Sequence, residues 1–507
     1  MVQAHSRPRV RQRPPGVSHG AAAPSLRKAG LARDHGRHPF LHRWGVLCPG
    51  GPGHAEGALV FAEWRKPGRE VAVIGLGRSG IAVSRLLRRG GVAVYASDKA
   101  SPSDAAAIQE LEAIGVVVEL GSHDLIRIAA ATAVVVSPGV PPTAAAILAA
   151  KKAGTPVFAE VDVAARALAD GTKVLGVTGT NGKTTTTALV AHLLAAAGRP
   201  SVAAGNIGLA LSEVAMDDAA PPWVVVELSS FQLHDAPHVV PTVGVLLNLT
   251  PDHLDRYGSL EAYYGDKANL FRNATPASIW VTNADDPEVQ RIAAAVPGTH
   301  LRFSLTERAD GWYDAATRQL MVGDTVVASR GDLHLLGSHN VANALASVLT
   351  VYAVGVSLEG IDRGLASFDP LPHRLEPVAT VDGVVWINDS KATNVVSTAM
   401  ATAALDAPFV LLLGGRHKGA PYTSLAPTLQ HCRAVVAYGE AAPIIVRDLT
   451  GTVPVYRESR FEDVLTRARH LAREGDAVLL SPACSSFDMF ANYEERGATF
   501  REAVGRL

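Results

Sequence analysis

The sequence has few cysteines and almost no net charge. Cysteine occurs three times in 507 residues, at Cys48, Cys432 and Cys484, without CxxC spacing. This pattern excludes a disulfide framework and a cysteine-rich structural zinc site, and it is typical of a reducing compartment. The formal net charge is -1, so we expect no general attraction to nucleic acid or to anionic membranes.

Long apolar runs are also absent. No uninterrupted run approaches the roughly 20 residues that cross a bilayer, because charged residues, glycine and proline break the alanine-rich stretches. The chain is longer than one hydrophobic core usually organises, so about two to four domains are expected. We therefore predict a cytoplasmic, monomeric enzyme with no nucleic-acid or membrane partner.

The first 67 residues differ in composition from the rest of the chain. They are rich in arginine, proline, glycine and histidine, and they show no sustained apolar period. Burial of side chains cannot then offset the entropy that is lost on ordering. We predict that residues 1–67 are a disordered extension or a misassigned start, with an organelle transit peptide or a functional arm as the alternatives.

The first organised unit contains a glycine-rich turn. An apolar run at residues 71–74 predicts a buried strand, and Gly75-Leu76-Gly77-Arg78-Ser79-Gly80 follows it before a helical stretch. A second predicted strand ends near Asp98. This GxGxxG pattern is compatible with a dinucleotide site, a mononucleotide site or merely tight turns. A later strand ends at residues 137–139, another loop where such folds bind ligands.

The second unit resembles a phosphate-binding P-loop. A predicted strand at residues 174–177 leads into Thr178-Gly179-Thr180-Asn181-Gly182-Lys183-Thr184-Thr185 and then a helix. Backbone amides of such a loop bind phosphate, Lys183 would reach the β- and γ-phosphates, and the Thr184 hydroxyl would bind Mg²⁺. The strict pattern has glycine at position 177, where this chain has Val177.

Acidic and basic residues follow later strands of the same unit. Glu227 ends an apolar run, which is the usual position of a carboxylate that binds a nucleotide-bound Mg²⁺. Asp252 and His253 follow another run, where they are candidate metal ligands, although Asp252 is equally suited to cap a helix. Lys267, taken alone, reads as a solvated charge on a helix.

The third unit repeats a strand followed by a polar loop four times, near residues 384–387, 409–413, 434–437 and 477–480. Alternation with helical stretches predicts a mostly parallel sheet. The predicted fold class is therefore α/β in three domains: a Rossmann-like domain at 68–165, a P-loop ATPase-type domain at 166–371 and a Rossmann-like domain at 372–507.

Several motifs together resemble the Mur ligase family of bacterial cell-wall synthesis. They are the P-loop, Glu227-Leu228-Ser229-Ser230-Phe231-Gln232-Leu233, Asp252-His253-Leu254-Asp255, Ser338-His339-Asn340-Val341-Ala342-Asn343-Ala344 and Pro372-His373-Arg374. The resemblance runs from about residue 70 to the end of the chain. The loops at residues 388–394 and 481–488 are most similar to the family members that join D-glutamate to UDP-N-acetylmuramoyl-L-alanine.

The resemblance implies an activity, substrates and cofactors. In this family a substrate carboxylate attacks the γ-phosphate of ATP, and an amino acid then displaces phosphate from the acyl phosphate. The implied cofactors are ATP and Mg²⁺ at two sites. Thr184 and Glu227 would hold the first ion, and His253 with a carbamylated Lys267 would hold the second. The implied catalytic residues are Lys183, Glu227, His253 and Lys267.

The resemblance also implies binding residues for each substrate. The implied ATP contacts are Gly179, Thr180, Asn181, Gly182, Lys183, Thr184, Thr185, Asn340, Asn343, Arg374 and Asp389. The implied contacts of the UDP-linked substrate are Gly77, Arg78, Ser79, Asp98, Ser137, Gly139, Asn206 and Ser229. The implied D-glutamate contacts are Lys391, Thr393, Lys418, Ser486 and Tyr493. Cys484 lies near this last group and is interpreted as structural.

Three alternatives remain at this point. A related ligase could use another acceptor or amino acid, such as L-alanine, a diamino acid or folate-linked glutamate. A dehydrogenase could use residues 75–80 for NAD, although this leaves the P-loop and the third domain unexplained. A non-catalytic nucleotide-binding scaffold is the third alternative.

Overall fold

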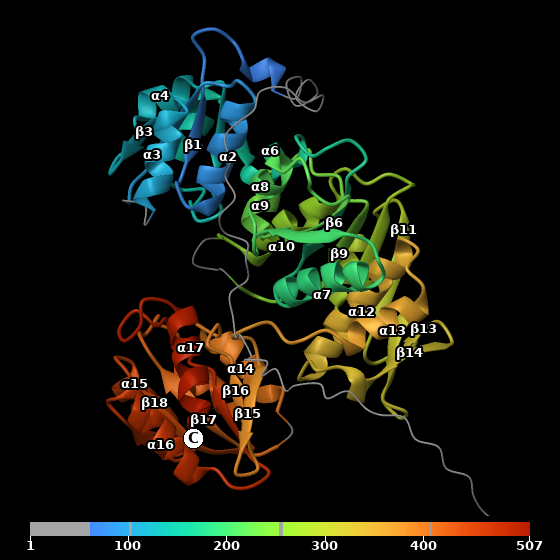
Figure 1. Cartoon of the computed structure of the whole chain (residues 1–507), viewed down its shortest axis with the longest axis vertical. Coiled ribbons are helices and arrows are strands. Elements are labelled where there is room, and N and C mark those ends of the chain that lie inside the picture. Colours follow the sequence, from blue (N-terminus) through green and yellow to red (C-terminus); the bar gives the residue numbers. More distant parts are fainter. Residues whose placement is uncertain (1–60, 101–103, 253–256, 406) are drawn as a thin grey trace, which may run out of the picture. The chain divides into compact units, whose positions relative to one another are not determined.

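The computed structural model describes residues 61–100, 104–252, 257–405 and 407–507, which form three β-sheets with their covering helices (Figure 1). The first sheet has the order β3-β2-β1-β4-β5, and all its strands are parallel. Its strands are β1 (Val71–Ile74), β2 (Val94–Asp98), β3 (Val117–Leu120), β4 (Ala133–Val136) and β5 (Val157–Ala159). Its helices are α2 (Arg78–Arg89), α3 (Ala105–Ala113), α4 (Leu125–Ala130), α5 (Ala145–Ala153) and α6 (Glu160–Ala165).

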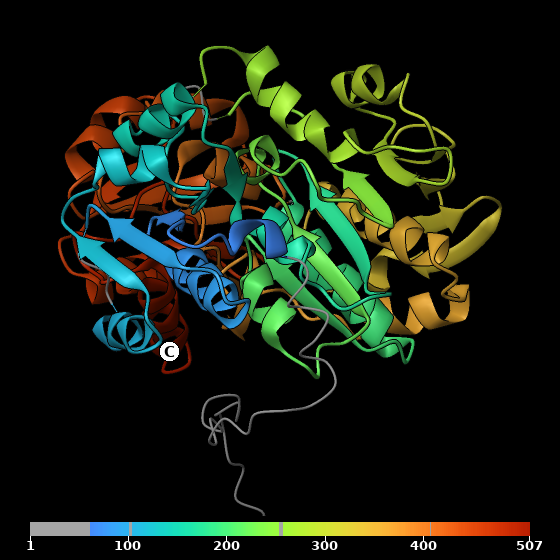
Figure 2. The ribbon, with the colours of Figure 1, turned by 90° about the horizontal axis from the view of Figure 1, so that it is seen from above.

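The second sheet has nine strands in the order β14-β13-β12-β11-β10-β9-β6-β8-β7, and Figure 2 shows its green strands side by side. The strands are β6 (Lys173–Thr178), β7 (Ser201–Gly205), β8 (Trp223–Glu227), β9 (Val243–Leu246), β10 (Ile279–Asn283), β11 (Thr299–Ser304), β12 (Gly311–Asp314), β13 (Gln319–Val322) and β14 (Thr325–Ser329). The helices are α7 (Lys183–Ala196), α8 (Leu211–Met216), α9 (Ser230–His234), α10 (Leu260–Ala268), α11 (Pro287–Ala293), α12 (Ser338–Ala353) and α13 (Leu358–Ala366), with short 3₁₀ turns η3 (Asn269–Phe271) and η4 (Arg330–Asp332).

The third sheet has the order β15-β16-β20-β17-β18-β19. Only the pair β15–β16 is antiparallel, so the prediction of a mostly parallel sheet is confirmed. The strands are β15 (Glu376–Val381), β16 (Val384–Asn388), β17 (Phe409–Gly414), β18 (Cys432–Tyr438), β19 (Val455–Arg457) and β20 (Ala477–Leu480). The helices are α14 (Val395–Ala403), the 3₁₀ turn η5 (Tyr422–Thr428), α15 (Ala442–Leu449), α16 (Phe461–Leu471) and α17 (Tyr493–Val504).

The central strands are apolar because both of their faces are covered. In β6, β8 and β9 almost every residue after the first is buried, as expected for parallel strands between two helical layers. α7 and α12 pack against each other, and both contact this sheet. The predicted architecture of three α/β domains is confirmed. The antiparallel strands β13 and β14 at the edge of the second sheet were not predicted.

Residues 61–67 correct the predicted extent of the N-terminal extension. They include the 3₁₀ turn η2 (Ala62–Trp64), and the side chains of Phe61 and Trp64 are buried in the core of the first domain. Their rings stack with centroids 5.5 Å apart, and the Arg166 guanidinium lies over Trp64. Two aromatic residues in so short a segment leave no periodic pattern, so the sequence did not reveal this contact. The prediction for residues 1–60 lies outside the described residues.

Two further predictions concern boundaries and membranes. The predicted domain limits at 165/166 and 371/372 fall between sheets, since β5 ends at Ala159, β6 begins at Lys173 and β15 begins at Glu376. These limits stay predictions. Across the described part of the chain, every helix is too short or too polar to cross a bilayer.

Candidate functional site

The loop between β6 and α7 is shaped to surround an anion. Gly182 has φ +82°, and a Cβ there would lie 2.2 Å from the Oδ1 atom of Asn343, so glycine is required. The Lys183 ammonium donates hydrogen bonds to the carbonyls of Gly179 (3.0 Å) and Thr180 (2.8 Å). The Lys183 side chain therefore folds back over this loop.

Asn248 fixes this loop from the neighbouring strand. Its Oδ1 accepts from the backbone amide of Asn181 (2.8 Å), and its Nδ2 donates to the Asn181 carbonyl (3.1 Å). Its own carbonyl accepts from the Thr180 amide (2.9 Å). The sequence did not indicate this role, although Asn248 follows β9, the strand beside β6.

A polar cavity of about 460 Å³ lies in front of the loop, and we call it the central pocket. Residues from several segments line it: Arg78, Thr180, Asn181, Gly182, Lys183, Thr184, Asn206, Ile207, Gly208, Glu227, Arg374, Lys391, Tyr493 and Glu494. The structure thus brings together predicted residues that are up to about 400 positions apart in the sequence. Arginine and lysine outnumber acids in this lining, which suits an anionic ligand.

Glu227 is the carboxylate in this pocket that fits a metal ion. It is only 2% exposed, and its Oε1 accepts from Asn206 Nδ2 (3.0 Å). Among the described residues, its Oε2 is buried without a hydrogen-bond partner. A buried carboxylate oxygen without a donor is costly, and a divalent cation would satisfy it.

Of the other predicted metal ligands, Thr184 lines the central pocket, and His253 cannot be compared. The Thr184 hydroxyl accepts a hydrogen bond from Arg374 Nη2 (2.8 Å), and it lines the same pocket as Glu227. His253 lies outside the described residues. Within residues 61–100, 104–252, 257–405 and 407–507, no cluster of three or more His, Cys, Asp or Glu side chains is suited to bind a metal.

Lys267 is buried beside the loop rather than solvated, as its helix position alone suggested. It is 1% exposed, its Nζ donates to the Gly179 carbonyl (2.7 Å), and it lies 4.8 Å from the centre of the Tyr263 ring. Burial, and then the charge of Lys183, lower the pKa of Lys267 well below its usual range. This shift favours the neutral amine, the form in which a lysine can act as a nucleophile.

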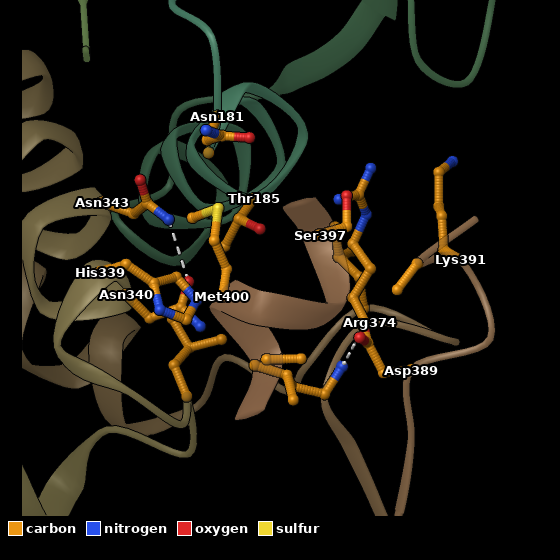
Figure 3. A pocket seen from close by; sticks show the side chains of 16 residues that line it. Asn181, Thr185, His339, Asn340, Asn343, Arg374, Asp389, Lys391, Ser397 and Met400 are labelled. Atoms are coloured by element: carbon orange, nitrogen blue, oxygen red, sulfur yellow. Dashed lines mark hydrogen bonds between the residues drawn. The ribbon is translucent and has the colours of Figure 1, made fainter. Parts of the chain in front are cut away.

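A second cavity of about 120 Å³ adjoins the loop at α12, and we call it the α12 pocket (Figure 3). Its polar lining includes Asn181, Thr185, His339, Asn340, Asn343, Arg374, Asp389, Lys391 and Ser397, and its apolar lining includes Leu335, Leu371, Leu375 and Met400. The Asn343 amide donates to Asn340 Oδ1 (3.0 Å), and Asn340 donates to the Leu336 carbonyl (2.7 Å). These bonds fix the orientation of both side-chain amides.

Asp389 lines the α12 pocket, and it comes from the loop after β16. Its carboxylate accepts from the Leu375 amide (3.2 Å) and from the Ser481 hydroxyl (2.8 Å). Burial raises the pKa of Asp389 to about 7. Every predicted ATP residue lines the central pocket or the α12 pocket, except Gly179, which lies in the loop itself. His339 and Met400 also line the α12 pocket and were not predicted as contacts. His339 belongs to the motif at residues 338–344, whereas no sequence pattern indicated a role for Met400.

A third cavity, of about 600 Å³, lies at the glycine turn of the first domain, and we call it the N-terminal pocket. Predicted residues that line it are Gly77, Arg78, Ser79, Asp98, Ser137, Gly139 and Asn206. Lys99 and His123 also line it and were missed. Ser229 is not among the lining residues; its side chain accepts from the Gln232 amide (3.2 Å) and caps α9.

Two of the predicted residues shape the N-terminal pocket through the backbone. The Asp98 carboxylate accepts from the amides of Leu76 (2.7 Å) and Ala100 (2.8 Å). The Ser137 hydroxyl donates to the Gly75 carbonyl (2.8 Å). Both side chains hold the glycine turn in place, so a ligand there would meet a turn that is already formed.

Of the five residues predicted to bind an amino acid, two line the central pocket and three do not. Lys391 and Tyr493 line the central pocket, where Lys391 Nζ donates to the Tyr493 hydroxyl (3.0 Å). Thr393, Lys418 and Ser486 lie outside the linings of the three pockets. Ser486 is buried, and Lys418 is exposed. The structure thus does not bring the five together in one cavity.

Comparisons with known proteins agree with this arrangement. Three family descriptions match in order along the chain: "Mur ligase MurD-like, N-terminal domain" at residues 69–159, "Mur ligase middle domain" at 177–351 and "Mur ligase, glutamate ligase domain" at 373–484. Together they cover most of the chain.

Curated relatives match over nearly their full length. Proteins called UDP-N-acetylmuramoylalanine--D-glutamate ligase are similar to this chain in Salinibacter ruber (42% identical; 86% of this chain and 97% of the relative), Myxococcus xanthus (40%; 87% and 99%) and Geobacillus kaustophilus (40%; 87% and 98%).

Solved structures share the fold at lower identity. UDP-N-acetylmuramate-alanine ligase from Thermotoga maritima aligns with a TM-score of 0.56 at 19% identity, over 86% of this chain and 99% of that chain. A ligase called MurF from the same organism, solved in complex with ADP, aligns with a TM-score of 0.56 at 18% identity, over 86% and 96%.

Proposed function

Because this chain belongs to the Mur ligase family, we propose that it joins D-glutamate to UDP-N-acetylmuramoyl-L-alanine in an ATP-driven reaction of peptidoglycan precursor synthesis. The observation that carries this proposal is the central pocket, where Lys183, Glu227 and Arg374 meet Lys391 beside a preformed phosphate-binding loop. The names of relatives that are about 40% identical indicate the substrates.

In the proposed reaction, the alanyl carboxylate attacks the γ-phosphorus of ATP and ADP leaves. The amino group of D-glutamate then attacks the acyl carbon, an amide bond forms, and inorganic phosphate leaves with a proton released. Both steps concentrate negative charge on oxygen atoms, so fixed cations and amide donors matter more than a protein nucleophile. Lys183, Arg374 and the loop amides would supply this stabilisation.

The three pockets support an assignment for each substrate. The N-terminal pocket suits the UDP group, because α2 begins there after the glycine turn and Arg78 and Lys99 line it. The α12 pocket suits adenosine, because Asn340 and Asn343 offer fixed amides and Met400 offers apolar contact. Arg78 and Asn206 line both the N-terminal pocket and the central pocket, so one substrate can extend from one to the other.

Magnesium fits the donor set of the central pocket. Glu227 and Thr184 would hold one ion, and His253 with a modified Lys267 would hold a second. When bound, Mg²⁺ would offset the repulsion between the attacking carboxylate and the phosphoryl oxygens. The unpartnered Glu227 Oε2 supports the first of these sites.

The surroundings of Lys267 support carbamylation. A neutral amine adds CO₂ to give a carbamate with loss of one proton, whereas an ammonium cannot react. Burial, and then the charge of Lys183, lower the pKa of Lys267 and so favour the neutral amine. The resulting anionic oxygens would face a region that is otherwise cationic, and they are suitable ligands for Mg²⁺.

The decisive experiment is a substrate panel. Phosphate release from ATP should require both UDP-N-acetylmuramoyl-L-alanine and D-glutamate, and mass spectrometry should identify the joined product. L-Alanine with the unsubstituted UDP-sugar, and a diamino acid with the longer peptide, are the comparison substrates. Release with only one of these would overturn the proposal in favour of a related ligase.

We further propose that the enzyme acts as a cytoplasmic monomer without nucleic-acid or membrane partners. Light scattering after size-exclusion chromatography should give a mass near the 53.0 kDa of one chain. A stable mass of twice this value would contradict the monomer.

A further inference from the structure

Arg496 on α17 is completely buried and is hydrogen-bonded to two separate loops. Its Nε donates to the Ser390 hydroxyl (2.9 Å), and its Nη2 donates to the Ser390 carbonyl (2.8 Å). Its Nη1 donates to the Cys484 carbonyl (3.2 Å). Arginine stays charged at any physiological pH and presents its donors in a rigid plane, so these bonds fix the two loops relative to each other.

The two loops follow adjacent parallel strands, and a third loop meets them there. Ser390 follows β16 and Cys484 follows β20, which pair with each other, while β17 lies on the other side of β20. In the loop after β17, a Cβ on Gly415 would lie 2.2 Å from the Ser485 carbonyl and 3.3 Å from Arg496 Nη1. Arg496 therefore occupies the junction of all three loops.

These loops carry the side chains proposed to bind D-glutamate. Lys391 and Thr393 follow Ser390, Ser486 follows Cys484, and Lys418 lies in the loop after β17. Tyr493 lies on the same helix as Arg496, one turn earlier, and its carbonyl accepts from the Ser390 hydroxyl (2.8 Å). A single buried side chain thus connects every segment of the proposed amino-acid site.

Among the described residues, the charge of Arg496 has no partner in a direct ion pair. Within the part of the chain that the structure describes, no Asp or Glu oxygen forms a salt bridge with it, although its charge acts on the buried carboxylate of Asp389, the residue before Ser390. A buried cation that is compensated only by a carboxylate outside direct contact is still unfavourable. A ligand that brings an extra negative charge to these loops would offset that cost.

We infer that Arg496 is a positioning residue that assembles the amino-acid loops, and that its fixed positive charge favours an amino acid with a second carboxylate. The identity of that amino acid as D-glutamate rests on the proposed function. Arg496 acts through Ser390 and Cys484, without contact with the substrate. It should therefore affect the binding of the amino acid more than that of ATP.

Steady-state kinetics of Arg496→Lys, Arg496→Met and Ser390→Ala variants test the inference. Lysine keeps the charge and loses the planar fork, methionine loses both, and Ser390→Ala removes one acceptor. The KM for D-glutamate should rise about tenfold or more in Arg496→Lys, further in Arg496→Met, and several-fold in Ser390→Ala. The KM for ATP should stay within about twofold. Arg501→Met is the control, since Arg501 is a half-exposed residue of the same helix that pairs with Glu376.

A neutral analogue separates charge from general loss of structure. D-Glutamine lacks the second carboxylate, so the preference of the enzyme for D-glutamate over D-glutamine should fall about tenfold in Arg496→Met. A uniform loss of kcat with every substrate and a lowered Tm, without a change in this preference, would mean that Arg496 is only structural and would overturn the inference.

The outcomes also separate this inference from the proposed function. If the wild-type enzyme does not use D-glutamate, the proposed function fails. If it does, and both Arg496→Lys and Ser390→Ala keep the wild-type KM for D-glutamate, only the inference fails. Those two variants decide the matter if Arg496→Met does not fold.

Discussion

The proposed ATP end of the central pocket and its proposed amino-acid end are built in different ways. At the ATP end, one continuous loop after β6 provides the amides and Lys183, and two distant side chains, Glu227 and Lys267, reach it from neighbouring segments. At the amino-acid end, five proposed contacts come from loops after three strands and from α17, and only Lys391 and Tyr493 line the pocket. A site made from one loop depends on local backbone geometry, whereas a site made from several loops depends on how they are held together.

The largest expected effect concerns the ATP end. Lys183→Ala removes the ammonium that lies over the loop, and we expect kcat to fall by about 1,000-fold or more because charge on the phosphoryl group is no longer stabilised. Phosphate release with both substrates measures this. Lys173→Ala, at an exposed position at the start of β6, the strand that precedes this loop, should keep full activity. Equal activity of the two variants would contradict the role of Lys183 in stabilising the phosphoryl charge.

The next effect concerns the buried lysine of the ATP end. Lys267→Met should lower kcat about 100-fold, because it cannot form the carbamate that would bind the second ion. In CO₂-depleted buffer the wild-type enzyme should lose activity and regain it with bicarbonate. Activity should also fall as the pH falls through the lowered pKa of Lys267, because protonation of the amine prevents its reaction with CO₂. Full activity without CO₂, with an unmodified lysine by mass spectrometry, would contradict this assignment.

A smaller effect should distinguish two lysines at the amino-acid end. Lys418→Ala should raise the KM for D-glutamate about tenfold and leave the KM for ATP unchanged, since Lys418 lies outside the central pocket. Lys391→Ala should raise both KM values, because Lys391 lines the central pocket and the α12 pocket. Arg460→Ala, an exposed arginine of the same domain, is the control. Identical kinetic profiles for the two lysine variants would show that the two ends are not separate.

The contrast between a site made from one loop and a site made from several loops also explains what could be predicted from the sequence. The P-loop was predictable because its residues are consecutive and their spacing fixes the backbone. Strands β1, β6, β17 and β20 were predictable because parallel strands covered on both faces are uniformly apolar. The α/β class follows from these strands and the helices between them.

Other features depend on contacts that the sequence does not encode locally. Asn248 and Met400 reach the pockets only because neighbouring elements pack together. The burial of Lys267 depends on where α10 lies against the loop, so its helix position alone predicted a solvated charge. Arg496 belongs to a helix with acidic and basic residues, and nothing in that pattern distinguishes the buried arginine from its exposed neighbours.

The smallest expected effect concerns a residue outside both ends of the central pocket. It shows whether the kinetic effects predicted above are specific. Glu160 is buried on α6, its Oε1 accepts from the Ser212 amide (2.7 Å), and burial raises its pKa to about 7. Between pH 4.5 and 7 the folded protein holds this proton and the unfolded chain does not, so the free energy of unfolding falls as the pH rises. The loss should reach about 3 kcal/mol at most, and Glu160→Gln should abolish it in urea unfolding across this range. Because Glu160 touches none of the three pockets, both KM values should stay at their wild-type levels, as they should in the exposed control Glu112→Gln. A change in the KM for D-glutamate in Glu160→Gln would mean that general stability, rather than the placement of the loops, controls the amino-acid end.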